Sequence, residues 1–247
     1  MSAFLDSLRE TRFWSRLRDL RHLRYRREQR RFLSAFIRKG GLVFDVGANV
    51  GHYTLVATSL GARVVAVEPQ AVLADRLRRR FRGSAAVTVV QCAVGAGPGT
   101  ASLHKTADLT EVASLRPDAG KRSRFAMTHP FSLSETVEVV TLESLIERHG
   151  RPDFCKIDVE GHEGAVLEGL KIPIAALSIE FNREYEEDTA RCINALAALG
   201  PYRFNYALAE ETRLAEAEWL DALQIQGSLR RHSDPRLWGD LYARLDP

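Results

Sequence analysis

The chain has 247 residues, of which 45% are hydrophobic and 27% are charged, and its formal net charge is +3. This length suits one α/β domain with a full core, and no apolar run approaches the roughly 20 residues that span a bilayer. The three cysteines are widely separated and odd in number, and the first residues do not form a secretory signal, so the sequence predicts a cytoplasmic protein without disulfides or a CxxC metal site.

The N-terminal region is strongly basic. Residues 1–38 contain eleven arginines against four acidic residues, no glycine and no proline. Recurring apolar residues predict a helix over residues 4–38, and we expect residues 1–39 to form a basic helical extension of a domain at 40–247. The helix has three interpretations: a cap over a binding site or a homodimer contact, a contact with an anionic membrane surface, or an RNA contact. Capping or dimerisation is favoured, and nucleic acid comes last because no RNA-binding motif accompanies the charge.

From residue 42 onward, predicted strands and helices alternate. The strands are expected at about 42–46, 63–68, 87–92, 153–158, 175–181, 202–207 and 240–244. The helices are expected near 52–60, 71–81, 141–149, 162–169 and 186–199. Such alternation is typical of an α/β protein with a parallel sheet that is covered by helices on both faces.

Residues 95–136 interrupt this alternation. Their glycine, proline, serine and charged residues predict a short hairpin around 100–104 and a long loop, and loops of this length are usually functional or disordered. The loop contains Arg122, Arg124 and His129 among aromatic residues, a mixture that suits an acceptor with a phosphate and a sugar ring, such as a nucleotide-linked or lipid-linked saccharide. A solvated, variable loop is the alternative.

The most informative segment joins the first strand to the first helix of the domain. Gly47 allows a sharp turn after the strand, and the helix that begins near Gly51 offers unpaired N–H groups to an anion. Asp45, at the strand end, can hold an ammonium group. Together these features suit an amino-acid zwitterion better than a pyrophosphate. His52 and Tyr53 are candidates for the same ligand, although His52 also suits an exposed helix start.

The next two strand ends complete a predicted ligand. Glu68 ends the second strand and can accept hydrogen bonds from two ribose hydroxyls. Around Cys92 and Ala93 the residues are small enough for an adenine ring to lie flat. The three strand ends therefore predict S-adenosylmethionine as the cofactor, and NAD is disfavoured because the spacing Gly47-x-x-x-Gly51 is not G-x-G-x-x-G.

Polar residues follow the fourth and fifth strands. Lys156 and Asp158 share one face of a strand at its carboxyl end, where ligands of open α/β sheets bind, although a buried ion pair is the alternative. Glu180 and Asn182 share a face of the fifth strand and are predicted to contact the substrate. A metal site from Asp158, His162 and Glu180 has suitable ligand types, but the spacing does not require one, and no metal is predicted.

Methyl transfer to a hydroxyl needs the acceptor oxygen in line with the methyl group and benefits from a base. His162 is the first candidate, because it titrates near neutrality and starts a helix. Asp158 or Glu160 can orient that base or accept the proton themselves. An ordinary solvated histidine is the alternative for His162, and Glu163 is interpreted as part of an acidic first turn.

Four segments together resemble the FkbM-type methyltransferases. They are Asp45-Val-Gly-Ala-Asn-Val-Gly51, Val67-Glu68-Pro69, Thr141-Leu-Glu-Ser-Leu145 and Phe154-Cys-Lys-Ile-Asp-Val-Glu-Gly-His-Glu163, and the terminal Gly239-Asp-Leu-Tyr242 is similar to that family's last strand. The resemblance covers residues 40–245. It implies a class I methyltransferase fold, Rossmann-like, with seven strands of which the last is antiparallel.

The resemblance also implies O-methylation of sugars or natural products. It adds Asn49 and Pro69 to the expected cofactor site and places Lys156, Asp158 and Glu160 at the reaction centre. The position after Gly161 varies in that family, which weakens His162 as the base. Two alternatives remain: a nicotinamide-dependent oxidoreductase, disfavoured by the glycine spacing and the lack of a Tyr-x-x-x-Lys pair, and a non-catalytic domain that binds S-adenosylmethionine.

Overall fold

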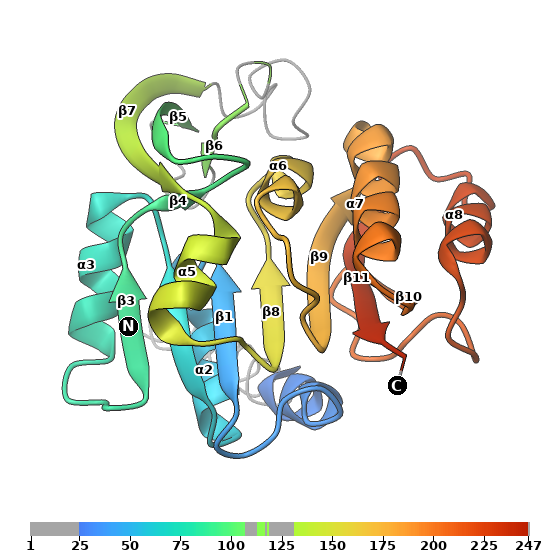
Figure 1. Cartoon of the computed structure of the whole chain (residues 1–247), viewed down its shortest axis with the longest axis horizontal. Helices are drawn as coiled ribbons and strands as arrows, with labels where there is room; N and C mark the ends of the chain where they lie inside the picture. Colours follow the sequence, from blue (N-terminus) through green and yellow to red (C-terminus); the bar gives the residue numbers. More distant parts are fainter. Residues whose placement is uncertain (1–24, 107–112, 117, 119–130, 247) are drawn as a thin grey trace, which may run out of the picture.

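A seven-stranded sheet forms the centre of the molecule. The computed structural model describes residues 25–106, 113–116, 118 and 131–246, and the sheet has the order β10-β11-β9-β8-β1-β2-β3 (Figure 1). Its strands are β1 (Leu42–Val46), β2 (Arg63–Val67), β3 (Val87–Val90), β8 (Phe154–Ile157), β9 (Ala176–Asn182), β10 (Tyr202–Leu208) and β11 (Trp238–Leu245). The predictions for Arg122, Arg124, His129 and residues 1–24 lie outside the described residues.

The central strands of the sheet are buried and parallel. All five residues of β1 are buried, as expected for a central strand covered on both faces, and β1 pairs in parallel with β2 and with β8. At the other end, β11 runs antiparallel to both β9 and β10. The predicted seven-stranded class I arrangement with an antiparallel last strand is therefore confirmed.

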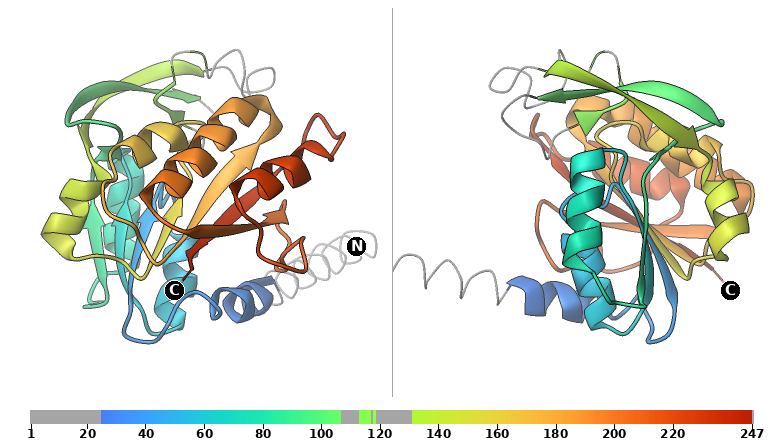
Figure 2. Two further views of the ribbon diagram at one scale, coloured as in Figure 1. Left: turned by 45° about the vertical axis from the view of Figure 1, so that its right-hand side comes forward. Right: turned by 90° about the vertical axis from the view of Figure 1, so that its left-hand side faces the viewer.

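Helices cover both faces of the sheet (Figure 2). A helix at 25–33, α2 (His52–Ser59) and α3 (Ala71–Arg80) pack on one face. The opposite face carries α5 (Leu142–His149), α6 (Glu163–Glu168), α7 (Glu186–Leu199) and α8 (Ala222–Arg230), of which α8 was not predicted. In the part of the chain that the structure describes, none of the helices has the length and apolarity needed to cross a bilayer.

The described part of the N-terminal extension packs on the domain itself. Its helix ends at residue 33 rather than 38, and a turn follows. Leu33 and Ile37 are 1% and 4% exposed, and Phe36 stacks on Tyr242 of β11 with ring centroids 5.0 Å apart. These apolar side chains fix the helix against the α2 face of the sheet.

A second, four-stranded sheet lies over the carboxyl ends of the central strands (Figure 1). It consists of β4 (Ala93–Val94), β5 (Gly99–Thr106), β6 (Ala113–Ser114) and β7 (Phe131–Val140) in the order β4-β7-β5-β6. The prediction of a hairpin at 100–104 followed by a loop to residue 136 was wrong here. The first half of β7 is largely solvent-exposed and rich in serine and glutamate, so its sequence has the composition of a loop. β7 nevertheless pairs with β5 along most of its length.

Candidate functional site

Two cavities meet where β8 ends. The first cavity lies between the ends of β1, β2 and β8 and the second sheet, and its empty space of about 630 Å³ includes open solvent. Of the residues predicted to bind the cofactor, six line it: Gly47, Asn49, Glu68, Pro69, Cys92 and Ala93. Leu103, Ala113 and Leu115 close it from the second sheet.

Glu68 is the polar anchor of the first cavity. Its side chain is 3% exposed, and its two oxygens accept hydrogen bonds from the backbone N–H groups of Asn49 and Gln70, each at 2.9 Å. Burial raises the pKa of Glu68 to about 7, although the two N–H groups act against this rise. A carboxylate has about four acceptor positions, so it can still accept hydrogen bonds from a ligand with paired hydroxyls.

Two glycines shape the turn beside Glu68 for different reasons. Gly47 has a φ of +79°, and a Cβ there would lie 1.8 Å from the carbonyl oxygen of Asp158, so only glycine allows β1 and β8 to approach this closely. Gly51 has the same φ, but a Cβ there would meet Leu77 and Phe81 of the α3 region. Gly51 therefore packs α2 against α3 and does not line the first cavity.

Three further predicted cofactor residues lie elsewhere. Asp45 is fully buried and lines neither cavity; its Oδ2 accepts a hydrogen bond of 2.5 Å from the Thr54 hydroxyl, and burial raises its pKa. His52 is exposed at the start of α2. Tyr53 is buried and lines the second cavity rather than the first. Asp45 thus positions the turn, and none of these three side chains lines the first cavity.

The second cavity has an open volume of about 550 Å³ and lies on the α2 face of the sheet. The helix at 25–33 covers it with Tyr25, Gln29, Phe32 and Leu33. The ends of β8, β9 and β11 supply its floor with Lys156, Asp158, Glu180 and Asp240. The sequence analysis did not single out Asp240 or the aromatic residues Tyr25 and Phe32 of the N-terminal helix. The sequence does not show which strands this helix crosses.

Lys156 and Asp158 form an ion pair at the junction of the cavities. The Lys156 Nζ lies 2.7 Å from Asp158 Oδ2, with the two side chains 13% and 33% exposed. Burial opposes the positive charge, but Asp158 and Asp45 together raise the pKa of Lys156 above its usual value. Asp158 lines both cavities and Lys156 lines the second, so the two residues border the cavities and also form the ion pair that was the alternative.

The loop after β8 has a fixed shape. Glu160 adopts a positive φ of 55° and lines the first cavity. Glu163, interpreted from sequence as a surface residue of a first turn, is 4% exposed, and its Oε1 accepts hydrogen bonds from the N–H groups of Val159 and Gly161 at 3.0 and 3.2 Å. Burial raises the pKa of Glu163 to about 7. Glu163 therefore holds the loop that presents Asp158 and Glu160.

The second sheet is tied to this loop. The Ser114 hydroxyl donates a hydrogen bond of 2.7 Å to the carbonyl of Glu160, and the Arg116 guanidinium donates one of 3.2 Å to the carbonyl of Gly161. Arg116 also forms ion pairs with Asp118 and Asp188. Arg116 therefore connects the second sheet to α7 and is fully engaged within the chain.

Two predicted residues lie away from the junction. His162 precedes α6 and lines neither cavity; burial and the charge of Arg116 lower its pKa. Asn182 ends β9 beside α7 and α8, whereas Glu180 lines the second cavity. His162 therefore lies outside both cavities, unlike Asp158 and Glu160.

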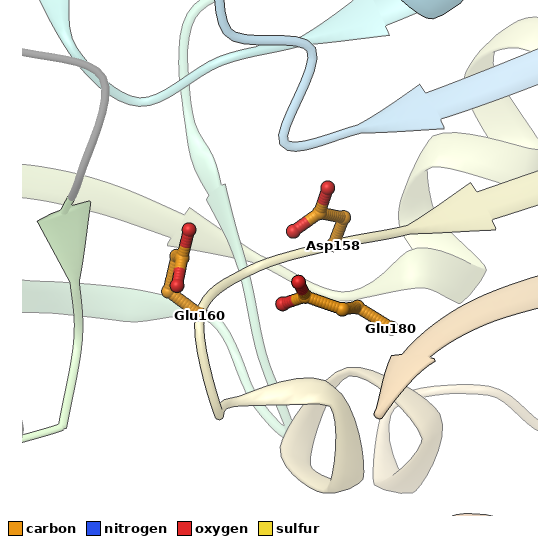
Figure 3. A group of neighbouring side chains, drawn as sticks. All are labelled: Asp158, Glu160 and Glu180. Atoms are coloured by element: carbon orange, nitrogen blue, oxygen red, sulfur yellow. The ribbon is translucent and has the colours of Figure 1, made fainter. Parts of the chain in front are cut away.

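Three carboxylates surround the junction of the cavities. Each of Asp158, Glu160 and Glu180 has an oxygen within 4.8 Å of an oxygen of the other two (Figure 3). The Lys156 ammonium already contacts Asp158 from one side. The group is a possible cation site in ligand type, and it differs from the combination considered from sequence by having Glu160 in place of His162.

The chain is similar to known methyltransferases. Residues 45–210 match the model of the methyltransferase FkbM domain. In an alignment over 163 residues, the chain is 32% identical to the 31-O-demethyl-FK506 methyltransferase FkbM of Streptomyces tacrolimicus, and the alignment covers 55% of this chain and 61% of that relative. A precorrin-6y C5,15-methyltransferase from Geobacter metallireducens is similar in structure, with a TM-score of 0.47 and 11% identity over 90% of this chain and 87% of its own. An O-methyltransferase from Bacillus cereus in complex with SAH has a TM-score of 0.46 and 13% identity, covering 91% and 81%.

Proposed function

Because the chain belongs to the FkbM methyltransferase family, we propose that it transfers a methyl group from S-adenosylmethionine to a hydroxyl of a sugar, a glycan precursor or a glycosylated natural product. The observation that carries this proposal is that Asp158 lines both cavities. A side chain in this position faces a cofactor on one side and an acceptor on the other. The name of the Streptomyces tacrolimicus relative, 31-O-demethyl-FK506 methyltransferase, supports oxygen as the acceptor atom.

The residues of the first cavity fit the cofactor. Glu68 offers acceptor positions to paired ribose hydroxyls, and the small side chains of Cys92 and Ala93 line the cavity where an adenine ring would lie. Gly47 and Asn49 line the cavity where the amino-acid end would lie. When bound, S-adenosylmethionine supplies a methyl group on a positively charged sulfur. The family assignment also favours this cofactor over the nicotinamide alternative.

Asp158 is the proposed base. It lies at the junction of the cavities, where it can accept the proton of an acceptor hydroxyl. Lys156 holds that carboxylate in place through the 2.7 Å contact, and Glu163 fixes the loop behind it. His162 has no part in this proposal, since it lines neither cavity.

We propose that the basic N-terminal region acts as a cap over the second cavity. The helix at 25–33 covers the second cavity, which supports capping among the interpretations of the extension. Homodimerisation and contact with a membrane surface concern arginines that lie largely outside the described residues and stay predictions. The expectation of a phosphorylated or lipid-linked acceptor was based on Arg122, Arg124 and His129, which lie outside the described residues, and it also stays a prediction.

Mass spectrometry of reaction products tests the function. The purified chain is incubated with S-adenosylmethionine and a panel of sugars, nucleotide sugars and glycosides, and tandem spectra locate any added methyl group on oxygen or nitrogen. We expect O-methylation that falls by about 100-fold or more in Asp158→Asn, the usual range for loss of a catalytic base, and that persists in the surface control Glu187→Gln. A chain that binds S-adenosylhomocysteine but methylates none of these compounds would support the non-catalytic alternative instead.

A further inference from the structure

Positive charge is concentrated on one face of the molecule. The helix at 25–33, α2 and α3 cover one face of the central sheet and together carry eight arginines and two acidic residues (Figure 2). The helices of the opposite face, α5 to α8, carry three arginines and seven acidic residues. The small net charge of +3 therefore hides a strong polarity across the sheet. We call the outer surface of the first three helices the basic face, and all of its arginines are exposed: Arg26, Arg27, Arg30, Arg31, Arg76, Arg78, Arg79 and Arg80.

Like charges lie close together on the basic face. Arg26 lies four positions before Arg30 on the N-terminal helix, and Arg76 has the same spacing to Arg80 on α3. Like charges at this spacing destabilise a helix. Charges of the two helices also act on one another: burial lowers the pKa of Arg80, and the charges of Arg26 and Arg76 lower it further. This accumulation costs stability that an anionic partner would restore.

The acidic residues of these three helices do not offset the charge. They are Glu28 and Asp75, and Asp75 is paired with Arg78 at 2.7 Å. Residues 1–24 lie outside the described part of the chain, but they contain six arginines against three acidic residues, so their net charge is also positive. A strongly basic surface attracts anionic partners at long range and raises their association rate. The basic face therefore has the charge of a docking surface for a polyanion.

An apolar side chain lies among these arginines. Val72 is 70% exposed. It precedes Arg76 by four positions and Arg79 by seven, so the three residues share the outer side of α3. Arginines next to exposed apolar groups are typical of helices that lie on a bilayer, where the cations contact headgroups and the apolar groups enter the interface. The phosphate backbone of a nucleic acid offers Val72 no apolar partner, which favours a bilayer as the polyanion.

We propose that the basic face docks on an anionic lipid bilayer, with its arginines contacting headgroup phosphates and Val72 entering the interface. The helix at 25–33 belongs to this face and also covers the second cavity. Docking therefore brings the proposed acceptor cavity to the lipid surface, where it meets an acceptor that the membrane carries. This consequence rests on the proposed function.

Flotation of the full chain with lipid vesicles, measured without cofactor or acceptor, tests the proposal. The vesicles consist of phosphatidylcholine alone or of phosphatidylcholine and phosphatidylglycerol in equal parts. We expect binding only to the mixed vesicles, and binding that weakens as the salt concentration rises. The double variant Arg76→Gln/Arg79→Gln should bind about tenfold or more weakly, because each arginine near an anionic surface contributes several-fold to the affinity.

A matched control and two further variants sharpen the test. Arg148→Gln/Arg230→Gln removes the same charge from exposed positions of α5 and α8 and should bind like the unmodified chain. Val72→Ser, which changes no charge, should weaken vesicle binding about threefold, since a valine side chain contributes to the affinity by leaving water. Arg26→Gln repeats the test on the N-terminal helix, and thermal unfolding shows which variants are folded.

Several outcomes would overturn the proposal. They are no binding to the mixed vesicles, equal binding to both kinds of vesicle, or full binding by the folded α3 double variant, which would assign the binding to arginines outside the basic face. Binding of polyuridylic acid without binding of vesicles would assign the face to nucleic acid. Oligomers that the double variant no longer forms, without vesicle binding, would assign it to the acidic face of a second copy. Vesicle binding by a chain that does not bind S-adenosylhomocysteine would support docking and contradict the proposed function alone.

Discussion

At the scale of single residues, Gly47 is the position where backbone geometry and the site depend on each other most. A Cβ at this position combines a left-handed φ, which costs a non-glycine residue about 1–3 kcal/mol, with a distance of 1.8 Å to the Asp158 carbonyl oxygen. We therefore expect Gly47→Ala to lower the free energy of unfolding by more than the cost of the left-handed backbone conformation alone.

Gly83 provides a matched control for this prediction. Its φ of +81° is nearly the same, but a Cβ there would have no atom within 4 Å. Denaturant unfolding should give Gly83→Ala a loss of about 1 kcal/mol, since alanine is strained only by φ, and Gly47→Ala a loss at least twice as large. Equal losses at the two positions would show that β1 and β8 can separate without cost.

Glu68 gives a prediction about pH. Burial raises the pKa of Glu68 to about 7, and the ribose hydroxyls of a bound cofactor would donate to its ionised form. The affinity for S-adenosylhomocysteine should therefore be highest well above pH 7, where Glu68 is ionised, and should fall as the pH decreases through 7. At pH 6 only about a tenth of the carboxyl groups are ionised, so the dissociation constant should be about tenfold higher than at pH 8. An affinity that is constant between pH 6 and 8 contradicts this role.

At the scale of elements, the N-terminal helix belongs to the packed core as far as the described residues show. Leu33 is 1% exposed against α2 and the sheet, whereas Leu223 of α8 is 84% exposed. We expect Leu33→Ala to cost about 2–5 kcal/mol in unfolding free energy and Leu223→Ala less than about 0.5 kcal/mol. Thermal unfolding of the two variants measures this, and a similar Tm for both would mean that the helix is not held on the domain.

The elements also show where sequence patterns were sufficient. Largely apolar runs such as Leu42–Val46, in which Asp45 is the one charged residue, predicted the buried parallel strands, because strands that are buried on both faces do not alternate between apolar and polar residues. The strand Phe131–Val140 was not predicted, since most of its first half faces solvent and its partner β5 lies over 25 residues away in sequence. The pairing, rather than local propensity, makes it a strand.

At the scale of the whole molecule, the site is assembled by contacts that a linear pattern does not contain. The cavity-lining residues at the ends of β1, β2 and β8 were predictable, because parallel strands bring their carboxyl ends to one edge. Tyr53 and Asp240 were assigned to the wrong cavity or to none, because their role depends on the N-terminal helix crossing β11. The N-terminal helix lines the second cavity alone, whereas Asp158 lines both.

The assignment of the first cavity to S-adenosylmethionine is the claim on which the other proposals depend. Calorimetric titration of the unmodified chain and of Glu68→Gln, with S-adenosylhomocysteine and separately with NAD, tests it most directly. We predict micromolar binding of S-adenosylhomocysteine, at least tenfold weaker binding by Glu68→Gln, and no binding of NAD. Binding of NAD alone, or equal binding of S-adenosylhomocysteine by both proteins, would contradict the assignment and with it the role given to Asp158.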